Sequence, residues 1–375
     1  MCVNKLVYSL LFSFALTIPL GYAAPAFAIT LTEISTGFPS PIGIDHHEEG
    51  AVDKVVMSVN YNLGVPNNFV LVASDGTQSA FSGISGFTDE VKIATARTGS
   101  VFPAGTLFTG NGIDGEIARI NPDGTIFGNP WVSLPGAGNG LMRGSLYVDT
   151  TGVYGGDLIV VTTLGEVWRI NSAGVASFIA DVNVHLEGVT TVPSDAAQYG
   201  PLAGKIIAGA EGVGLLYVFN SAGFVATYDV DVNIEDIDLI TGTENFYGVN
   251  FGTSRLLGAP ASEFAAMAGD ILLTSEFGVS PSGLYVLSWN GVSLTAPQLP
   301  LSPGSETPGQ WEHVTFSSAG IGVVPPTDQV IGGEIIPIDT TALLIAGTQS
   351  SSVWMISGVG LAAGLGFIFL RKKNF

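Results

Sequence analysis

A hairpin-like pattern returns about every 50 residues in the central part of the chain. Each copy has a short aliphatic run, a second run rich in aromatic and aliphatic residues, and a polar turn that ends in glycine. The copies cover residues 54–76, 105–124, 156–174, 204–223 and 269–291. The first four closing glycines, Gly76, Gly124, Gly174 and Gly223, are 48, 50 and 49 residues apart, and Gly291 follows after 68 more. Repeats of this length made of short strands predict a β-propeller, in which each repeat forms one four-stranded blade.

A second series of segments lies between the hairpins and predicts the innermost strand of each blade. Its members are residues 42–47, 88–93, 143–148, 185–190, 235–239 and 311–316. Six such strands predict six blades, but the strand pair expected at 246–260 has no clear hairpin turn, so five or seven blades also fit the pattern. We expect residues 29–36 to pair with the last blade, because a closed ring leaves no long strand edge exposed. The predicted fold class is all-β.

These hairpins resemble those of six-bladed propellers of the NHL-repeat and gluconolactonase-like group, and the resemblance covers most of the body. It implies a ring of six blades around a central channel. Gluconolactonase-like propellers hold a divalent ion with acidic and amide side chains on their inner strands, and the ion polarises the carbonyl of a lactone or ester. The Asn and Asp ligand motifs of that group do not map onto positions in this chain.

The excess of acidic residues limits which partners the protein is expected to bind. The chain contains 12 Lys and Arg residues against 32 Asp and Glu residues, which gives a formal net charge of -20. Nucleic acid is not expected as a partner, because binding to phosphates needs clustered basic residues. A surface of this charge attracts cations instead.

The six inner segments contain every histidine of the chain and many of its acids. Since the inner strands of a propeller all start at one mouth of the channel, these side chains are expected to converge there. The candidate channel-mouth residues are Asp45, His46, Asp89, Glu90, Arg143, His185, Glu187, Glu235, Asp236, Glu312 and His313. Carboxylates suit Ca²⁺ and added imidazoles admit Mn²⁺ or Zn²⁺, so the candidate metal ligands are Glu187, Glu312, His185 and His313. Alternatively, these side chains only line a water-filled tunnel or satisfy backbone groups.

Two functions are consistent with these features. The first is a surface binding or structural module without catalysis. The second follows from the gluconolactonase resemblance and is a divalent-metal-dependent lactonase or esterase-like hydrolase, with Glu187 and Glu312 as ligands and His185 or His313 as the base. The chain contains no G-x-S-x-G, H-E-x-x-H or P-loop motif that would indicate another chemistry.

The N-terminus is typical of a secretory signal peptide. Lys5 precedes an apolar run, and Ala26-Phe27-Ala28 matches an A-x-A cleavage site. We therefore expect residues 1–28 to be removed and residues 29–324 to form the propeller body. The single cysteine, Cys2, lies in the segment that is expected to be removed, so no disulfide is predicted in the mature protein.

The C-terminus predicts a membrane anchor. Residues 353–370 are 18 residues without a charge, the lower limit for a helix that crosses the hydrocarbon core. Three basic residues follow, so residues 371–375 are expected in the cytoplasm. With the linker and motif at 325–352, this tail resembles the C-terminal anchoring signals of prokaryotic, especially archaeal, surface proteins. We expect the body at the cell surface, held to the membrane by this helix, with a surface ligand or protein as its partner.

Overall fold

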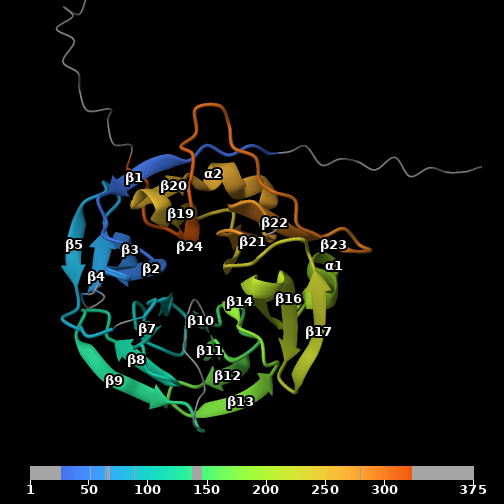
Figure 1. Cartoon of the computed structure of the whole chain (residues 1–375), viewed down its shortest axis with the longest axis horizontal. Coiled ribbons are helices and arrows are strands. Elements are labelled where there is room, and N and C mark those ends of the chain that lie inside the picture. The colour runs from blue at the N-terminus through green and yellow to red at the C-terminus, as the bar shows by residue number, and fades with distance from the viewer. Residues whose placement is uncertain are drawn as a thin grey trace, which may run out of the picture. The chain divides into compact units, whose positions relative to one another are not determined.

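The computed structural model describes residues 27–322, except residues 51, 64, 66–67, 88, 137–145 and 279. Its strands form six four-stranded sheets, which stand around a central axis as the blades of a propeller (Figure 1). This arrangement confirms the all-β class and the six-bladed prediction over the five- and seven-bladed alternatives. The predicted linker, membrane helix and basic tail, and most of the predicted signal peptide, lie outside the described residues. No helix within the described part is long and apolar enough to cross a membrane.

Blades 1 to 4 follow one another along the chain, and each is built from its innermost strand outward. Blade 1 contains β2 (Ile44–Glu49), β3 (Val52–Val59), β4 (Asn68–Val72) and β5 (Gln78–Phe81). Blade 2 contains β6 (Ala94–Thr95), β7 (Leu107–Gly110), β8 (Glu116–Ile120) and β9 (Ile126–Ser133). Blade 3 contains β10 (Leu146–Val148), β11 (Leu158–Val161), β12 (Glu166–Ile170) and β13 (Ala176–Asp181). Blade 4 contains β14 (Glu187–Thr191), β15 (Ile206–Ala210), β16 (Leu215–Asn220) and β17 (Gly223–Asp229).

Blades 5 and 6 are interleaved along the chain. Blade 5 contains β18 (Asp236–Leu239), β21 (Ile271–Ser275), β22 (Gly283–Trp289) and β23 (Leu294–Thr295). Blade 6 contains β24 (Trp311–Ser317), β19 (Asn245–Asn250), β20 (Arg255–Ala259) and β1 (Thr32–Thr36). The chain therefore leaves blade 5 after its innermost strand, forms the two middle strands of blade 6, and then returns to complete blade 5. The N-terminal β1 pairs with β20, which confirms the predicted closure of the ring.

Short helical turns occur only between the strands of the described part. They are α1 (Ala196–Tyr199), η1 (Gly200–Leu202), η2 (Glu211–Val213), η3 (Phe251–Thr253), α2 (Ala261–Phe264) and η4 (Ala265–Met267). Phe246 of β19 stacks on Phe264 of α2 with ring centroids 5.2 Å apart, and it also contacts Trp311 of β24. These aromatic contacts attach the interleaved segment to the innermost strand of blade 6.

Six hydrophobic clusters hold the ring together, one between each pair of adjacent blades. Between blades 2 and 3, for example, Phe108 of β7 packs in the same cluster as Val160 of β11. The middle strands are covered on both faces, which is why β11 and β21 are buried along their whole length. Burial on both faces favours continuous aliphatic runs over strict alternation, and these runs are the ones that open each sequence repeat.

The polar turns that close the repeats connect the third and fourth strands of blades 1 to 5. In blade 1 the turn glycine, Gly76, has a φ of +81°. A Cβ atom there would lie 2.2 Å from the carbonyl oxygen of Ile34 in β1. Glycine is required at this turn both by its backbone angle and by the close approach of blade 6.

One predicted inner strand begins later than expected. The segment at 88–93 leads into β6, which starts only at Ala94. The carbonyl oxygens of Val91 and Lys92 accept hydrogen bonds from the hydroxyl groups of Ser58 and Thr109, at 2.5 and 2.6 Å. These two backbone acceptors bond to side chains, and Asp89 and Glu90 lie before β6.

Candidate functional site

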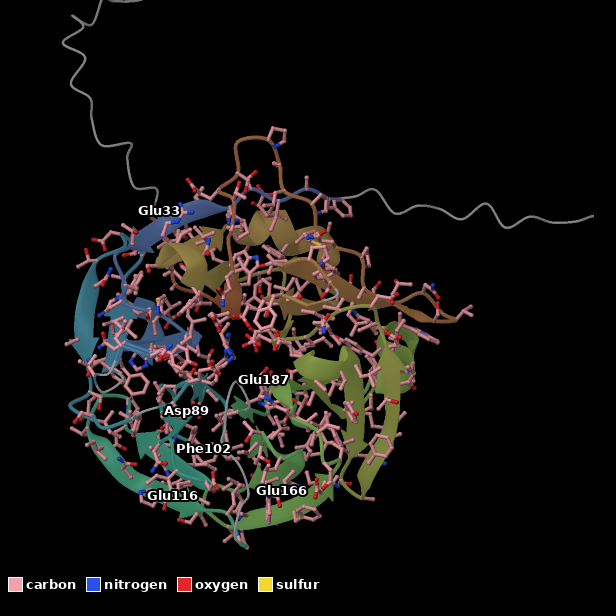
Figure 2. All side chains as sticks on the ribbon, in the orientation of Figure 1. Glu33, Asp89, Phe102, Glu116, Glu166 and Glu187 are labelled. Carbon is pink, nitrogen blue, oxygen red and sulfur yellow. The ribbon has the colours of Figure 1, made fainter. Side chains whose placement is uncertain are left out.

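Several inner strands begin at one end of the central channel, which we call the entrance. Glu187 is the first residue of β14, Glu235 directly precedes β18, and Glu312 is the second residue of β24. All three residues are buried, with exposed fractions of 5%, 3% and 4%. Figure 2 shows Glu187 near the axis, whereas Glu116 and Glu166 lie toward the circumference of the ring. The entrance thus collects acids from three blades, as the inner-strand series predicts.

A lysine lies among these acids. Lys92 is 1% exposed, and its Nζ forms an ion pair with Glu235 Oε1. Burial by itself lowers the pKa of Lys92, but the carboxylates of Glu235, Glu187 and other glutamates outweigh burial and hold this pKa above its ordinary value. Lys92 is therefore a permanent positive charge at the entrance. The entrance cluster, as used below, consists of Lys92, Glu90, Glu187, Glu211, Glu235, Glu276 and Glu312.

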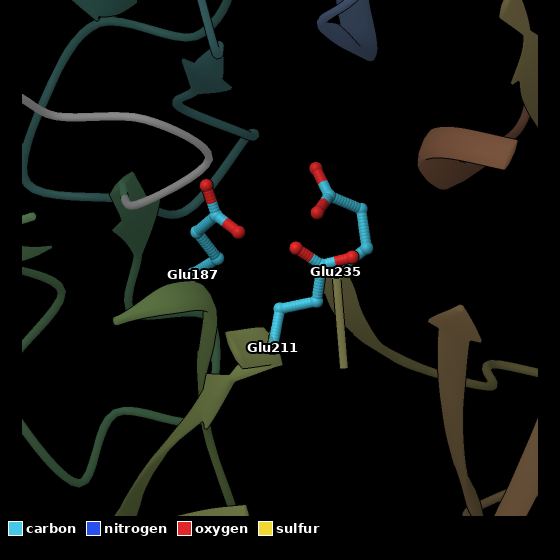
Figure 3. A group of neighbouring side chains, drawn as sticks. All are labelled: Glu187, Glu211 and Glu235. Atoms are coloured by element: carbon cyan, nitrogen blue, oxygen red, sulfur yellow. The ribbon is translucent and has the colours of Figure 1, made fainter. Parts of the chain in front are cut away.

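Three carboxylates of the entrance cluster converge on one point. Glu187, Glu211 and Glu235 each offer an oxygen atom, and these atoms lie within 4.8 Å of one another. Figure 3 shows the three side chains directed toward a shared space. Glu211 comes from the turn between β15 and β16, and its buried Oε1 has no hydrogen-bond partner among the described residues. Burial, together with Glu187 and Glu276, raises the pKa of Glu211 to about 7.

Glu312 and Glu276 extend the cluster toward blade 6. The side-chain amide of Gln310 donates hydrogen bonds to both, to Glu276 Oε1 and to Glu312 Oε1, the latter at 3.3 Å. Burial and the neighbouring acids raise the pKa of Glu276, and they raise that of Glu312 well above its usual range although Lys92 opposes the change. Burial likewise raises the pKa of Glu235 well above its usual range despite its ion pair. One lysine therefore does not balance the six carboxyl groups.

Two histidines accompany the acids. The Nε2 atom of His185 is 3.1 Å from Glu187 Oε1, and the His185 side chain is 40% exposed. Burial by itself raises the pKa of Glu187, but the nearby His185 and the charge of Lys92 outweigh burial and lower this pKa. His313 lies deeper, with 5% exposure, between Glu235 Oε1 at 3.6 Å and Asp236 Oδ2 at 3.4 Å. Asp236 also accepts a hydrogen bond from Val314 N at 2.9 Å, and burial raises its pKa to about 6.

The remaining candidates from the sequence lie elsewhere or at the margin of this cluster. Asp45 lies farther along the channel, where it accepts hydrogen bonds from Thr95 N at 2.6 Å and Thr315 Oγ1 at 3.0 Å. The Nδ1 atom of His46 is 2.7 Å from Ser317 Oγ of blade 6, so its ring lies between blades. Asp89 is half-buried in the segment before β6, beside Glu90. Arg143 lies outside the described residues.

The sequence analysis missed three members of the entrance cluster: Lys92, Glu211 and Glu276. Glu211 directly follows β15 and Glu276 directly follows β21, so both occupy the same turn of their blades, between the second and third strands. An acid directly after the second strand of successive repeats is the signal that would have revealed them. Lys92 lies inside a predicted inner segment but has the opposite charge to the residues sought there.

The donor atoms of the converging carboxylates favour calcium over zinc. Ca²⁺ binds six to eight oxygens at about 2.3 to 2.6 Å, so oxygens up to about 5 Å apart can bind the same ion. Zn²⁺ in structural sites prefers nitrogen or sulfur ligands, which these three side chains do not offer. The oxygen spacing within 4.8 Å and the free Glu211 Oε1 therefore fit a calcium-sized ion.

Comparison with known proteins finds similarity to solved structures alone. No protein-family profile matches the chain, and no curated protein matches it. A catalytically inactive variant of virginiamycin B lyase from Staphylococcus aureus is similar at 12% identity and a TM-score of 0.43, over 75% of this chain and 92% of that one. A gluconolactonase from Xanthomonas campestris is similar at 13% identity and a TM-score of 0.45, over 73% and 80%. The six-bladed ring itself is established by the sheet topology.

Proposed function

We propose that the protein is a membrane-anchored β-propeller of the cell surface whose channel entrance binds a divalent cation, with Ca²⁺ as the best fit. The observation that carries this proposal is the convergence of Glu187, Glu211 and Glu235 within 4.8 Å. Carboxylates so close together cannot all stay ionised unless protons or a cation relieve their repulsion. A bound cation would replace the proton of Glu211, whose pKa is about 7.

The bound ion would connect two blades. Glu187 and Glu211 belong to blade 4, whereas Glu235 directly precedes the innermost strand of blade 5. An ion that is held by all three binds the folded ring and not the unfolded chain, so it stabilises the fold in proportion to its affinity. This supports a binding and structural role for the entrance.

Calorimetric titration of the purified full chain with Ca²⁺ tests the proposal. We expect one bound ion in the wild type and binding at least about tenfold weaker in Glu211→Gln, because one charged ligand is lost. Glu33→Gln is the matched control, since Glu33 lies in the outer strand β1 and is 40% exposed. The cation site would be rejected if the wild type bound no Ca²⁺, or if Glu211→Gln bound it as tightly as the control.

A hydrolase is the second candidate, and the position of His185 is what supports it. Its imidazole is partly exposed at the edge of the cluster, and its Nε2 atom lies 3.1 Å from Glu187 Oε1, close to the candidate metal ligands where a general base would act. His313 is less suited, because carboxylates face both of its ring nitrogens. A screen of lactones and esters with Ca²⁺, Mn²⁺ and Zn²⁺ decides between the two: turnover that is lost in His185→Ala would establish the hydrolase.

The location on the cell surface rests on the terminal segments of the sequence. The apolar run at 353–370 and the basic residues after it support a membrane anchor with the body outside. Deleting residues 350–375 is expected to release the protein into the medium. Retention of the shortened chain in the cytoplasm would contradict both terminal assignments.

A further inference from the structure

A cavity of about 320 Å³ occupies the channel on the far side of Asp236 and His313 from the entrance cluster. It reaches residues that follow the inner strands, including Arg97 after β6, Thr150 after β10 and Thr241 after β18. Thr241 is exposed, so the cavity opens to solvent at the end of the channel opposite the entrance. We call it the far cavity.

Most polar groups of the far cavity already have partners. Arg97 Nη1 forms an ion pair with Glu244 Oε1 at 2.6 Å, and Arg97 Nη2 donates to the carbonyl oxygen of Phe316. The hydroxyl groups of Tyr147 and Thr150 lie 2.7 Å apart. Asp45 is occupied by its hydrogen bonds from Thr95 and Thr315. Of the groups named here, Glu244 Oε2 alone lacks a hydrogen-bond partner among the described residues.

Asp238 is different. It lies in β18 on the wall of the far cavity, and it makes no hydrogen bond or ion pair with the described residues. Asp236 and Asp45 lie near enough to repel its negative charge, and with burial they raise the pKa of Asp238 well above its usual range. Arg97 attracts the same carboxylate but is already engaged by Glu244. The cavity therefore presents one carboxyl group that forms no ion pair with the described residues and that a bound cation would hold in its ionised form.

The residues that line the far cavity limit which cations can pair with Asp238. Ile44, Ile93, Val189 and Val314 contribute apolar surface to the far cavity. A metal ion would need several oxygen ligands at once, whereas Asp238 is the carboxyl group of the described lining that forms neither an ion pair nor a hydrogen bond, and Glu244 is held by Arg97. A small alkylamine fits both Asp238 and the apolar lining. Its ammonium group pairs with Asp238, and its alkyl chain lies against the aliphatic side chains. A volume near 320 Å³ is at the small end of ligand pockets, which limits the ligand to a small molecule.

We propose that the far cavity binds a small organic amine, with Asp238 as the counter-ion of its ammonium group and the aliphatic wall as the seat of its alkyl chain. This site is separate from the cation site at the entrance, because Asp236 and His313 lie between them. The two sites are expected to fill independently.

Titration of the purified full chain with n-pentylamine, followed by calorimetry, tests this proposal. We expect binding to the wild type, and no binding of 1-pentanol or pentanoic acid, which have the same chain without the positive charge. Asp238→Asn keeps the shape of the side chain and is expected to weaken pentylamine binding about tenfold or more, the loss of one charge-assisted hydrogen bond. Asp231→Asn is the matched control, because Asp231 is exposed in the turn after β17.

A second variant guards against an effect of Asp238→Asn on folding. Thr243 is exposed and lines the mouth of the far cavity, so Thr243→Arg places a positive charge there without disturbing the core. It is expected to weaken pentylamine binding and to leave Ca²⁺ binding unchanged. The proposal is overturned if pentylamine does not bind, if Asp238→Asn binds it like the control, or if Ca²⁺ competes with it.

Discussion

Lys92 and Arg97 are five residues apart in the sequence and lie at opposite ends of the same channel. Each is paired with a glutamate, Lys92 with Glu235 at the entrance and Arg97 with Glu244 beside the far cavity. The Lys92 side chain is 1% exposed and lies among carboxylates, whereas that of Arg97 is 27% exposed and also binds a backbone carbonyl. The entrance is filled with acidic side chains, and the far end keeps an open volume of about 320 Å³.

The difference follows from the shapes of the two cations. An ammonium group is a compact charge, so several carboxylates can surround it. A guanidinium is planar and directs its donors in one plane, and Arg97 uses them for Glu244 and the Phe316 carbonyl. The proposed ion site and the proposed amine site thus lie at opposite ends of one channel.

Replacing Lys92, the positively charged side chain at the entrance, should reduce the stability of the fold most. Lys92→Met leaves Glu235 and its neighbours buried without their positive partner, so we expect the free energy of unfolding to fall by about 3 to 5 kcal/mol. Lys205→Met is the control, because Lys205 is half-buried and donates only to the carbonyl of Ala203. Urea denaturation followed by circular dichroism measures both. A loss no greater than that of the control would show that the entrance does not depend on Lys92.

Replacing Arg97, the positively charged side chain at the far end, should reduce the stability of the fold less. Arg97→Met breaks one ion pair and one hydrogen bond, but Glu244 is 17% exposed and can be partly solvated. We therefore expect a loss of about 1 to 3 kcal/mol, measured in the same urea experiment. The contrast between the two ends would be refuted if Arg97→Met were more damaging than Lys92→Met.

The pH dependence of stability should be smaller and opposite to that of most acidic groups. Because the pKa values of Glu211, Glu235 and Glu312 are raised in the folded state, the folded chain binds more protons than the unfolded chain between about pH 4.5 and 7. Stability contributed by these groups is therefore lost as the pH rises through that window. Glu187, whose pKa is lowered, acts in the opposite sense.

Thermal melts at pH 5 and pH 8 in the presence of EDTA check this expectation. The melting temperature should be higher at pH 5, and Ca²⁺ should raise it at pH 8, where the glutamates are ionised. In Glu211→Gln both differences should shrink, since one of the raised carboxyl groups is gone. A melting temperature that increases steadily to pH 8 without added ions would contradict the sign of the raised pKa values.

Local pattern was sufficient to predict most of the ring. The repeated hairpins predicted the second and third strands of blades 1 to 5, and the N-terminal strand closes the ring as expected. The interleaving of blades 5 and 6 was not predictable, because nothing in residues 245–259 indicates whether they pair with β18 or with β24. That choice depends on contacts such as Phe246 with Trp311, which join residues 65 positions apart.

The candidate site was only partly predictable for a similar reason. Inner-strand position was enough to expect Glu187, Glu235 and Glu312 near one another, since strand starts share one end of a propeller. Glu211 comes from a different strand of its blade, and its approach to Glu187 depends on how far a turn extends over the channel. The far cavity could not be predicted from the sequence. Asp238 resembles the acids beside it in the sequence, and only the structure shows that it forms no hydrogen bond or ion pair with the described residues.

The interleaved blades also constrain how this protein could evolve. Blades 1 to 4 are each one continuous stretch of chain, so a duplication or deletion of about 50 residues would add or remove a whole blade there. Blades 5 and 6 share residues 236–317 and also need β1, so no cut within this stretch frees either one. Evolutionary gain or loss of a single blade is therefore expected only among blades 1 to 4. Blades 5 and 6 can be gained or lost only together.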